Sequence, residues 1–83
     1  MMRYEVYVTG KPGIFDPAGK TTAGALSNLG YAGVAQVRIG KFIQLSCDDS
    51  VSLEQLTEMC EKLLANPIIE DYRIEEVLEG AEG

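Results

Sequence analysis

Residues 35–47 read AQVRIGKFIQLSC, and this stretch decides the fold. Its odd positions carry Ala, Val, Ile, Lys, Ile, Leu and Cys, whereas its even positions are mostly polar. An alternation of period two is typical of a strand with one buried face. A two-residue hairpin at Gly40-Lys41 would put the apolar residues of the two halves on opposite faces. We therefore favour one long strand, bent or bulged at Gly40, over a hairpin.

Two elements are expected before this stretch. Residues 4–8 alternate with period two and predict the first strand, which the segment Gly10-Lys11-Pro12-Gly13 should end. Asp16-Pro17 has the features of a helix start, because Asp at the N-cap accepts backbone N–H bonds and proline suits the first helical position. Apolar residues then recur at helical spacing as far as Gly30, which can adopt the left-handed conformation that ends a helix.

A second helix and a last strand are expected after it. The cluster Asp48-Asp49-Ser50 offers N-caps, and an apolar stripe follows at Leu53, Leu56, Cys60, Leu63 and Leu64. Asn66-Pro67 should end this helix, because the residue before a proline is pushed out of the helical region. Residues 68–78 predict the final strand, with Tyr72 and Ile74 on one face.

The element order predicts an α+β fold. It is a small β-α-β-α-β unit with a long bent central strand and two helices on one face of the sheet. The ferredoxin-like order β-α-β-β-α-β is the alternative if the strand breaks at Gly40. A 13-residue strand would overhang a three-stranded sheet and leave edge groups unpaired, which favours pairing with another copy of the chain. We therefore expect an oligomer, with a single domain over residues 1–79 and a flexible tail at 80–83.

Composition narrows the function. Seven basic and thirteen acidic residues among 83 give a net charge of −6, which speaks against nucleic-acid and anionic membrane partners. The chain has no histidine, the usual acid–base group near neutral pH, and its two cysteines lack the Cys-x-x-Cys spacing. The start of the chain has no apolar signal core, so we expect a cytoplasmic protein. These features predict a protein module with few residues suited to catalysis.

Two groups of residues are candidate small-molecule sites. Gly19-Lys20-Thr21 resembles the end of a phosphate-binding loop, but Ile14 stands where that motif needs its first glycine. Asp16 would also put a carboxylate where phosphate should sit, so a capped helix start is the better interpretation. Three cations near the bend could bind an anion or a carboxylate of a protein partner, or form a solvated rim: Lys11, Arg38 and Lys41.

Four phrases of the sequence form a recognisable set. They are Lys11-x-Gly13-Ile14-x-Asp16-Pro17-x-Gly19, Leu29-Gly30-Tyr31, Val37-Arg38-Ile39-Gly40-Lys41, and Met59-Cys60-x-Lys62-Leu63-Leu64-Ala65-Asn66-Pro67-Ile68-Ile69-Glu70-Asp71-Tyr72. Together they resemble the PurS family, the small subunits of phosphoribosylformylglycinamidine synthase. The resemblance spans residues 4–75, and Phe15 departs from it by standing where the family commonly has Leu.

The resemblance implies an accessory role in purine biosynthesis. In that family a glutaminase subunit releases ammonia, which an ATP-dependent synthetase subunit uses to convert formylglycinamide ribonucleotide to formylglycinamidine ribonucleotide. The small subunit self-associates as a homodimer or homotetramer, bridges the two larger subunits and assists ammonia transfer. The alternative function is a ferredoxin-like module that senses small ligands.

The resemblance also implies which residues matter. It assigns no catalytic residue, cofactor site or metal site to this chain, because ATP, Mg²⁺ and glutamine are used by the complex. The matched phrases carry over seven interface candidates: Lys11, Asp16, Arg38, Gly40, Lys41, Asn66 and Tyr72.

Overall fold

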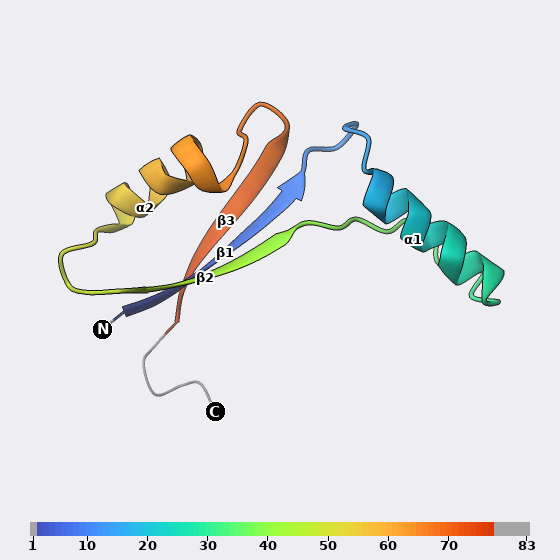
Figure 1. Cartoon of the computed structure of the whole chain (residues 1–83), viewed down its shortest axis with the longest axis horizontal. Coiled ribbons are helices and arrows are strands. Elements are labelled where there is room, and N and C mark those ends of the chain that lie inside the picture. The colour runs from blue at the N-terminus through green and yellow to red at the C-terminus, as the bar shows by residue number, and fades with distance from the viewer. Residues whose placement is uncertain (1, 78–83) are drawn as a thin grey trace.

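The computed structural model describes residues 2–77, which contain three strands and two helical segments (Figure 1). The strands are β1 (Met2–Gly10), β2 (Lys41–Cys47) and β3 (Glu70–Val77). Helix α1 (Pro17–Asn28) follows β1, and helix α2 (Leu53–Met59) follows β2 and continues as a π-helical turn, η1 (Cys60–Leu64). The order confirms the predicted α+β fold. The tail predicted at 80–83 lies outside the described residues.

The strands form one antiparallel sheet in the order β2-β1-β3. Val6 in β1 is opposite Ile43 on one side and Ile74 on the other, so apolar residues of all three strands share a face. The alternation predicted from the sequence is therefore confirmed. The buried residues of β1 on this face are Tyr4, Val6 and Val8, and the side chains packed against them include Ile43, Leu45, Tyr72 and Ile74.

Helix α2 and the turn η1 cover this apolar face. Leu56 and Cys60 are fully buried against the sheet. The helix begins at Ser52, whose hydroxyl accepts the Gln55 N–H while the Gln55 side chain accepts the Ser52 N–H, each at 3.1 Å. This capping box satisfies two helix-end donors. The predicted N-caps at residues 48–50 are wrong, because Asp48 instead accepts from Ser50 in the preceding turn.

The predicted strand over residues 35–47 is wrong in its first half. Only residues 41–47 pair with β1, and the last pair is Val8 with Lys41. Gly40 still lies close to Val8 and Thr9 but outside the ladder, and β1 ends at Gly10, so residues 35–38 have no strand to pair with within the described chain. β2 is also an edge strand, since β1 occupies the middle of the sheet. The hairpin at Gly40 is absent, which excludes the ferredoxin-like order.

Helix α1 does not cover the sheet, contrary to the prediction of two helices on one face. Figure 1 shows it beyond the end of the strands, with residues 35–40 running back along it. Gly19 is its one buried residue. We call residues 11–40 the arm.

The ends of α1 are as the sequence predicts. The Asp16 carboxylate caps the helix, Pro17 is the first helical residue, and Gly30 has φ +100° just after the last turn. Glycine tolerates this left-handed conformation, which stops the helix. Within residues 2–77 neither helix is long or apolar enough to cross a membrane.

Candidate functional site

The base of the arm is held by Asp16. One oxygen of its carboxylate accepts the Gly19 N–H at 2.9 Å, and the other accepts the Ile39 N–H at 2.8 Å. These backbone donors, Ile39 first, hold the pKa of Asp16 below its usual value. Arg38 donates to the carbonyl oxygen of Gly10, at the end of β1. One carboxylate thus ties the first turn of α1 to the returning chain.

Two glycines let the backbones at this junction approach closely. A Cβ on Gly19 would overlap the carbonyl oxygen of Val37, and a Cβ on Gly40 would overlap that of Val8. Two of the phrases that resemble the PurS family, 11–19 and 37–41, therefore meet in space as one junction. Of the interface candidates, Asp16, Arg38 and Gly40 lie in it.

The other four candidates lie around the sheet. Lys41 donates to the carbonyl oxygen of Leu64, the last residue of η1, at 2.7 Å, and so ties the helix to the edge strand. Lys11 pairs with Asp71 at 3.2 Å, where both side chains are largely exposed. Asn66 accepts the Ile68 N–H through its side chain at 3.2 Å and shapes the turn into β3.

Tyr72 joins β3 to the turn η1. Its hydroxyl donates to the Glu61 carboxylate at 2.6 Å, and this bond, with a smaller effect of desolvation, raises the pKa of Tyr72 to about 12. The seven candidates therefore form two groups: Lys11, Asp16, Arg38 and Gly40 lie at the base of the arm, and Lys41, Asn66 and Tyr72 lie where the sheet meets η1. The sequence predicted the Asp16 cap but not the intramolecular partners or close contacts of the other six.

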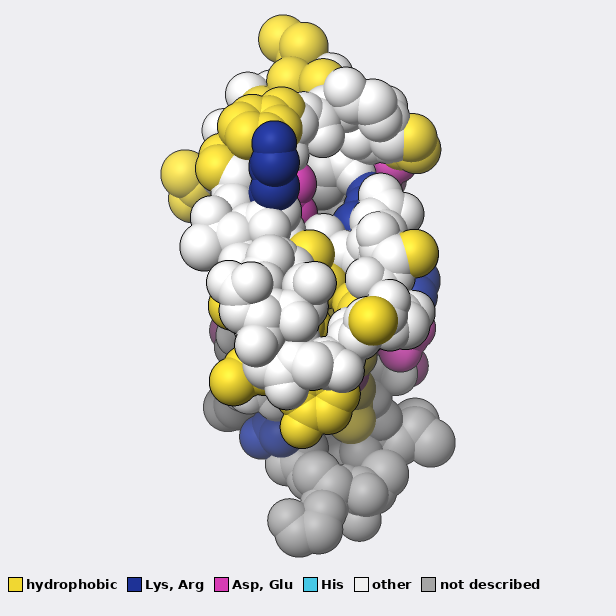
Figure 2. Space-filling view, turned by 90° about the vertical axis from the view of Figure 1, so that its right-hand side faces the viewer, with side chains coloured by type: hydrophobic (Ala, Val, Ile, Leu, Met, Phe, Trp, Pro, Cys, Tyr) yellow, Lys and Arg dark blue, Asp and Glu magenta, His cyan; other side chains and the backbone are white. Residues whose placement is uncertain are grey.

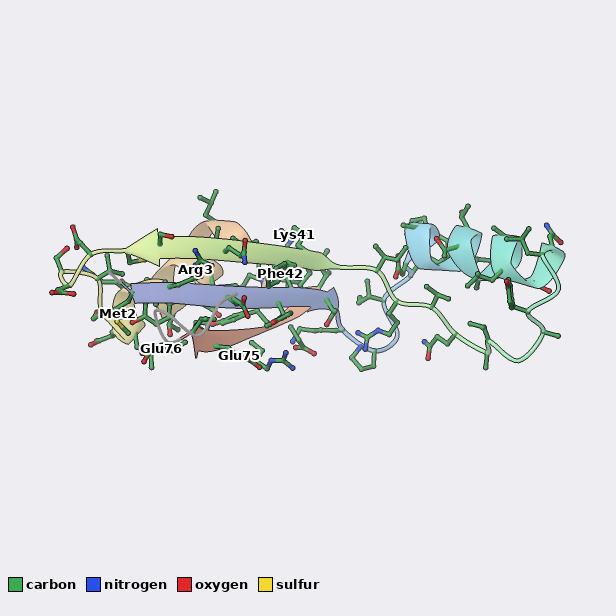
Figure 3. The ribbon with its side chains drawn as sticks, turned by 90° about the horizontal axis from the view of Figure 1, so that it is seen from below. Met2, Arg3, Lys41, Phe42, Glu75 and Glu76 are labelled. Carbon is green, nitrogen blue, oxygen red and sulfur yellow. The ribbon has the colours of Figure 1, made fainter. Side chains whose placement is uncertain are left out.

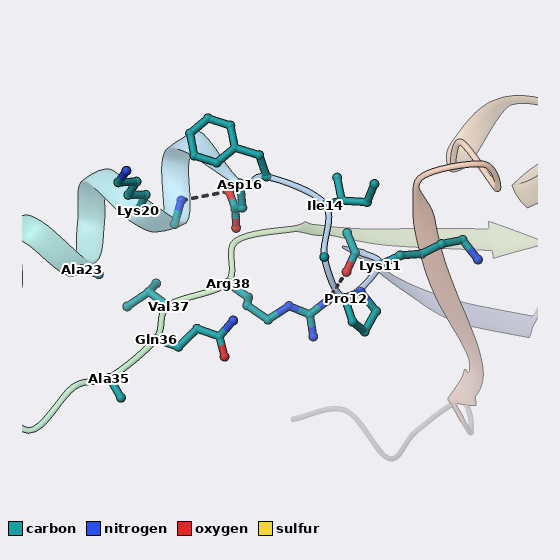
Figure 4. Close-up of a pocket in the computed structure, with 14 residues that line it drawn as sticks. Lys11, Pro12, Ile14, Asp16, Lys20, Ala23, Ala35, Gln36, Val37 and Arg38 are labelled. Carbon is teal, nitrogen blue, oxygen red and sulfur yellow. Dashed lines mark hydrogen bonds between the residues drawn. The ribbon is translucent and has the colours of Figure 1, made fainter.

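A pocket of about 320 Å³ opens at the base of the arm, between residues 10–16, the start of α1 and residues 35–38 (Figure 4). Lys11 and Lys20 line its rim, but Figure 4 shows their side chains directed away from it. The Lys20 ammonium lies 5.8 Å from the centre of the Phe15 ring, and Lys41 lies outside the pocket. Since the cations do not converge, the geometry does not form an anion site here.

The arm exposes most of its apolar side chains. Among the described residues eleven large hydrophobic side chains are exposed, and six of them belong to the arm: Ile14, Phe15, Leu29, Tyr31, Val34 and Ile39. Figure 2, which looks at the molecule from the arm end, shows hydrophobic side chains standing out on this surface. An apolar surface of this kind marks a contact with another molecule.

The face of the sheet opposite α2 is also uncovered within the described chain (Figure 3). Its centre is the ring pair of Tyr7 and Phe42, 5.1 Å apart, and the Arg73 guanidinium lies 4.3 Å from the centre of the Tyr7 ring. Tyr7 donates to Glu5 at 2.9 Å, which is the main reason that its pKa is raised. The Tyr7 hydroxyl and the Arg73 guanidinium on this face therefore have partners within the chain.

Metal binding and thiol chemistry can be examined directly among residues 2–77. No three His, Cys, Asp or Glu side chains there are placed to hold a metal ion. The thiol of Cys60 is buried, and desolvation raises its pKa, which disfavours the nucleophilic thiolate. The exposed arm and the outer face of the sheet offer surfaces for contacts with proteins.

Comparison with known proteins agrees with this geometry. The family model PurS, described as phosphoribosylformylglycinamidine (FGAM) synthase, matches residues 3–77. The PurS subunit of this synthase from Synechocystis is 49% identical over 80 residues, covering 92% of this chain and 80% of its own. That from Bacillus subtilis is 47% identical over 77 residues, covering 90% and 92%.

Solved structures resemble the fold as well. Bacillus subtilis PurS superposes with a TM-score of 0.85 at 44% identity, covering 94% of this chain and all of that one. A chain of the Thermotoga maritima PurLQS structure superposes with a TM-score of 0.77 at 28% identity, covering 92% and 96%.

Proposed function

The chain belongs to the PurS family, and from this premise we propose that it is the non-catalytic small subunit of phosphoribosylformylglycinamidine synthase. In this role it contributes to purine biosynthesis by binding a large synthetase subunit and a glutaminase subunit. ATP, Mg²⁺ and glutamine are used by those subunits and not by this chain. The relative in the PurLQS structure supports the assembly.

The observation that carries the proposal is that the arm has no hydrophobic core of its own. Gly19 is the one buried residue of α1, and six large hydrophobic side chains of the arm are exposed. An isolated helix of 12 residues is marginal in water, so tertiary contacts must stabilise it. Contacts with another protein supply what the chain itself lacks.

A second copy of the chain is the proposed occupant of the arm, as a homodimer or homotetramer. The six exposed hydrophobic side chains of the arm form an apolar surface that a second copy would cover. Residues 35–40 add a backbone edge with which no strand of residues 2–77 pairs.

The physical benefit of such a subunit is the protection of ammonia. Ammonia in water near neutral pH is mostly protonated, and ammonium is a poor nucleophile. A bridge that holds the two larger subunits in register and excludes bulk water keeps the neutral form available to the synthetase. The small subunit then assists the conversion of formylglycinamide ribonucleotide to formylglycinamidine ribonucleotide without catalytic groups of its own.

Reconstitution tests this function. The two larger subunits are assayed with and without the chain, using glutamine as nitrogen source and, as the control, added ammonium. We expect the chain to raise glutamine-dependent amidine formation and leave the ammonium-dependent rate nearly unchanged. Equal coupling of glutamine hydrolysis to product without the chain would refute the bridging role. Sedimentation equilibrium of the chain alone tests self-association, and a monomer at tens of micromolar would exclude it.

A further inference from the structure

Acidic and basic side chains are divided between two parts of the molecule. Residues 2–47 hold five basic and two acidic residues. Residues 48–64, which run from the end of β2 through α2 and η1, hold five acidic residues and one basic residue. We call residues 48–64 the acidic end. Its net charge is −4, and Figure 1 places α2 far from the arm.

The basic side chains already have partners inside the chain. Lys62 pairs with Glu58 at 3.6 Å and Arg73 with Glu75 at 2.8 Å. In the arm, Lys11 pairs with Asp71, Lys20 lies against the Phe15 ring, and Arg38 donates to a backbone carbonyl oxygen. Lys41 in β2 also donates to a backbone carbonyl oxygen. Asp49 and Glu54, in contrast, have no basic partner among residues 2–77. A second copy would therefore have to break its own contacts to neutralise the acidic end, whereas another protein could bring its own cations.

The acidic end contains a hollow of about 510 Å³ beside α2. Val51, Met59 and Leu63 give it an apolar lining, and Glu58 and Lys62 lie at its edge. Leu63 is 81% exposed, although Leu56 and Cys60 of the same helical segment are fully buried against the sheet. The buried side fixes the helix on the sheet, so the hollow is presented on a rigid support.

We propose that this hollow is the docking site for a larger subunit of the synthase, which inserts an apolar side chain from a surface rich in Lys and Arg. The proposal rests on the proposed function and adds the surface and the partner chemistry. Charge complementarity selects the partner, since the net charge of −4 on the acidic end repels a second acidic end and attracts a basic surface. The arm then remains available for self-association, at the opposite end of the molecule.

The test compares two exposed leucines in the full chain. Leu63→Ser changes the hollow, and Leu29→Ser, at a site 73% exposed on the arm, is the matched control. Binding of each variant to the separate synthetase and glutaminase subunits is measured by calorimetry, and sedimentation equilibrium reports self-association. We expect Leu63→Ser to weaken binding to one larger subunit about tenfold and leave sedimentation unchanged. Leu29→Ser should weaken self-association and keep that binding.

Salt and charge give a second readout. Binding of the unmodified chain should weaken as salt rises, and the double variant D49N/E54Q should show a smaller salt dependence. The proposal would be overturned if Leu63→Ser bound both larger subunits as tightly as the unmodified chain does, or if the substitution weakened self-association instead of this binding. Either result would leave the bridging function intact. If the unmodified chain binds neither larger subunit, the proposed function fails with it.

Discussion

Alanine at Gly19, compared with alanine at Gly24, measures how tightly the arm is packed at its base. Both glycines lie within α1, so both substitutions gain the same helix propensity, about 1 kcal/mol. They differ in their surroundings. A Cβ at Gly24 meets no atom within 4 Å, whereas a Cβ at Gly19 overlaps the carbonyl oxygen of Val37. Because that neighbour is backbone, it cannot move aside as a flexible side chain would.

The magnitude follows from the difference between the two variants, in which the propensity gain cancels. Overpacking of a close contact costs about 1–3 kcal/mol. Gly24→Ala should therefore stabilise the arm by about 1 kcal/mol, and Gly19→Ala should be less stable than Gly24→Ala by about 1–3 kcal/mol. That free-energy range corresponds to a factor of roughly 5 to 150 in a local opening equilibrium.

Amide hydrogen exchange at Ile39 reports this opening, since its N–H donates to Asp16 at the base of the arm. We expect protection at Ile39 to be roughly 5 to 150 times lower in Gly19→Ala than in Gly24→Ala, while amides of β1 exchange as before. Equal protection in the two variants would refute the packing of α1 on residues 37–39. Loss of protection in β1 as well would mean that the arm and the sheet unfold as one unit.

Three further perturbations test the polar contacts. Asp16 has a lowered pKa, so its contribution to stability is present above the unfolded value and is lost as pH falls through the lowered one. Protection of the arm amides, relative to the intrinsic exchange rate at each pH, should be full at pH 5 and fall below about pH 4, and protection that stays constant there would contradict this role. Tyr72 should ionise at about pH 12 in an ultraviolet titration, so the stability from its bond to Glu61 is present below pH 10 and is lost through pH 12. A titration of Tyr72→Phe that still shows this step would contradict the assignment. Lys41→Met removes the hydrogen bond to the Leu64 carbonyl and should cost about 1 kcal/mol, or roughly 4–8 °C in melting temperature, and an unchanged melting temperature would show that the contact contributes nothing.

Features that depend on neighbouring residues in the chain could be predicted from the sequence. The alternation around β2 placed Ile43 and Leu45 on the core side, and Asp16 and Gly30 marked the two ends of α1. Each of these signals acts over a few residues. The limits of β2 could not be predicted in the same way, because they depend on which residues pair with β1 across the ladder. The pairing stops at Lys41 opposite Val8, two residues before β1 ends at Gly10.

The position of α1 escaped prediction for a related reason. Its apolar spacing is that of a helix that covers a sheet, but residues 11–16 lead it away from the strands. The role of the interface candidates could not be predicted either. A charged residue beside a glycine looks the same in the sequence whether its partner lies in the same chain or in another protein. The exposed Phe15, which the sequence offered only as a departure from the family, belongs to the surface that the structure leaves uncovered.

The separation of charge limits the ways in which two copies of the chain can associate. Repulsion between two acidic ends acts over about 8 Å at physiological salt, so it opposes only arrangements that bring these ends together. Association through the arms, at the far end of the molecule, avoids that repulsion while covering the exposed apolar side chains. The copies would then hold their acidic ends apart, each open to a basic surface. A chain built in this way can join itself and a larger partner at the same time, because the two contacts use different ends and different forces.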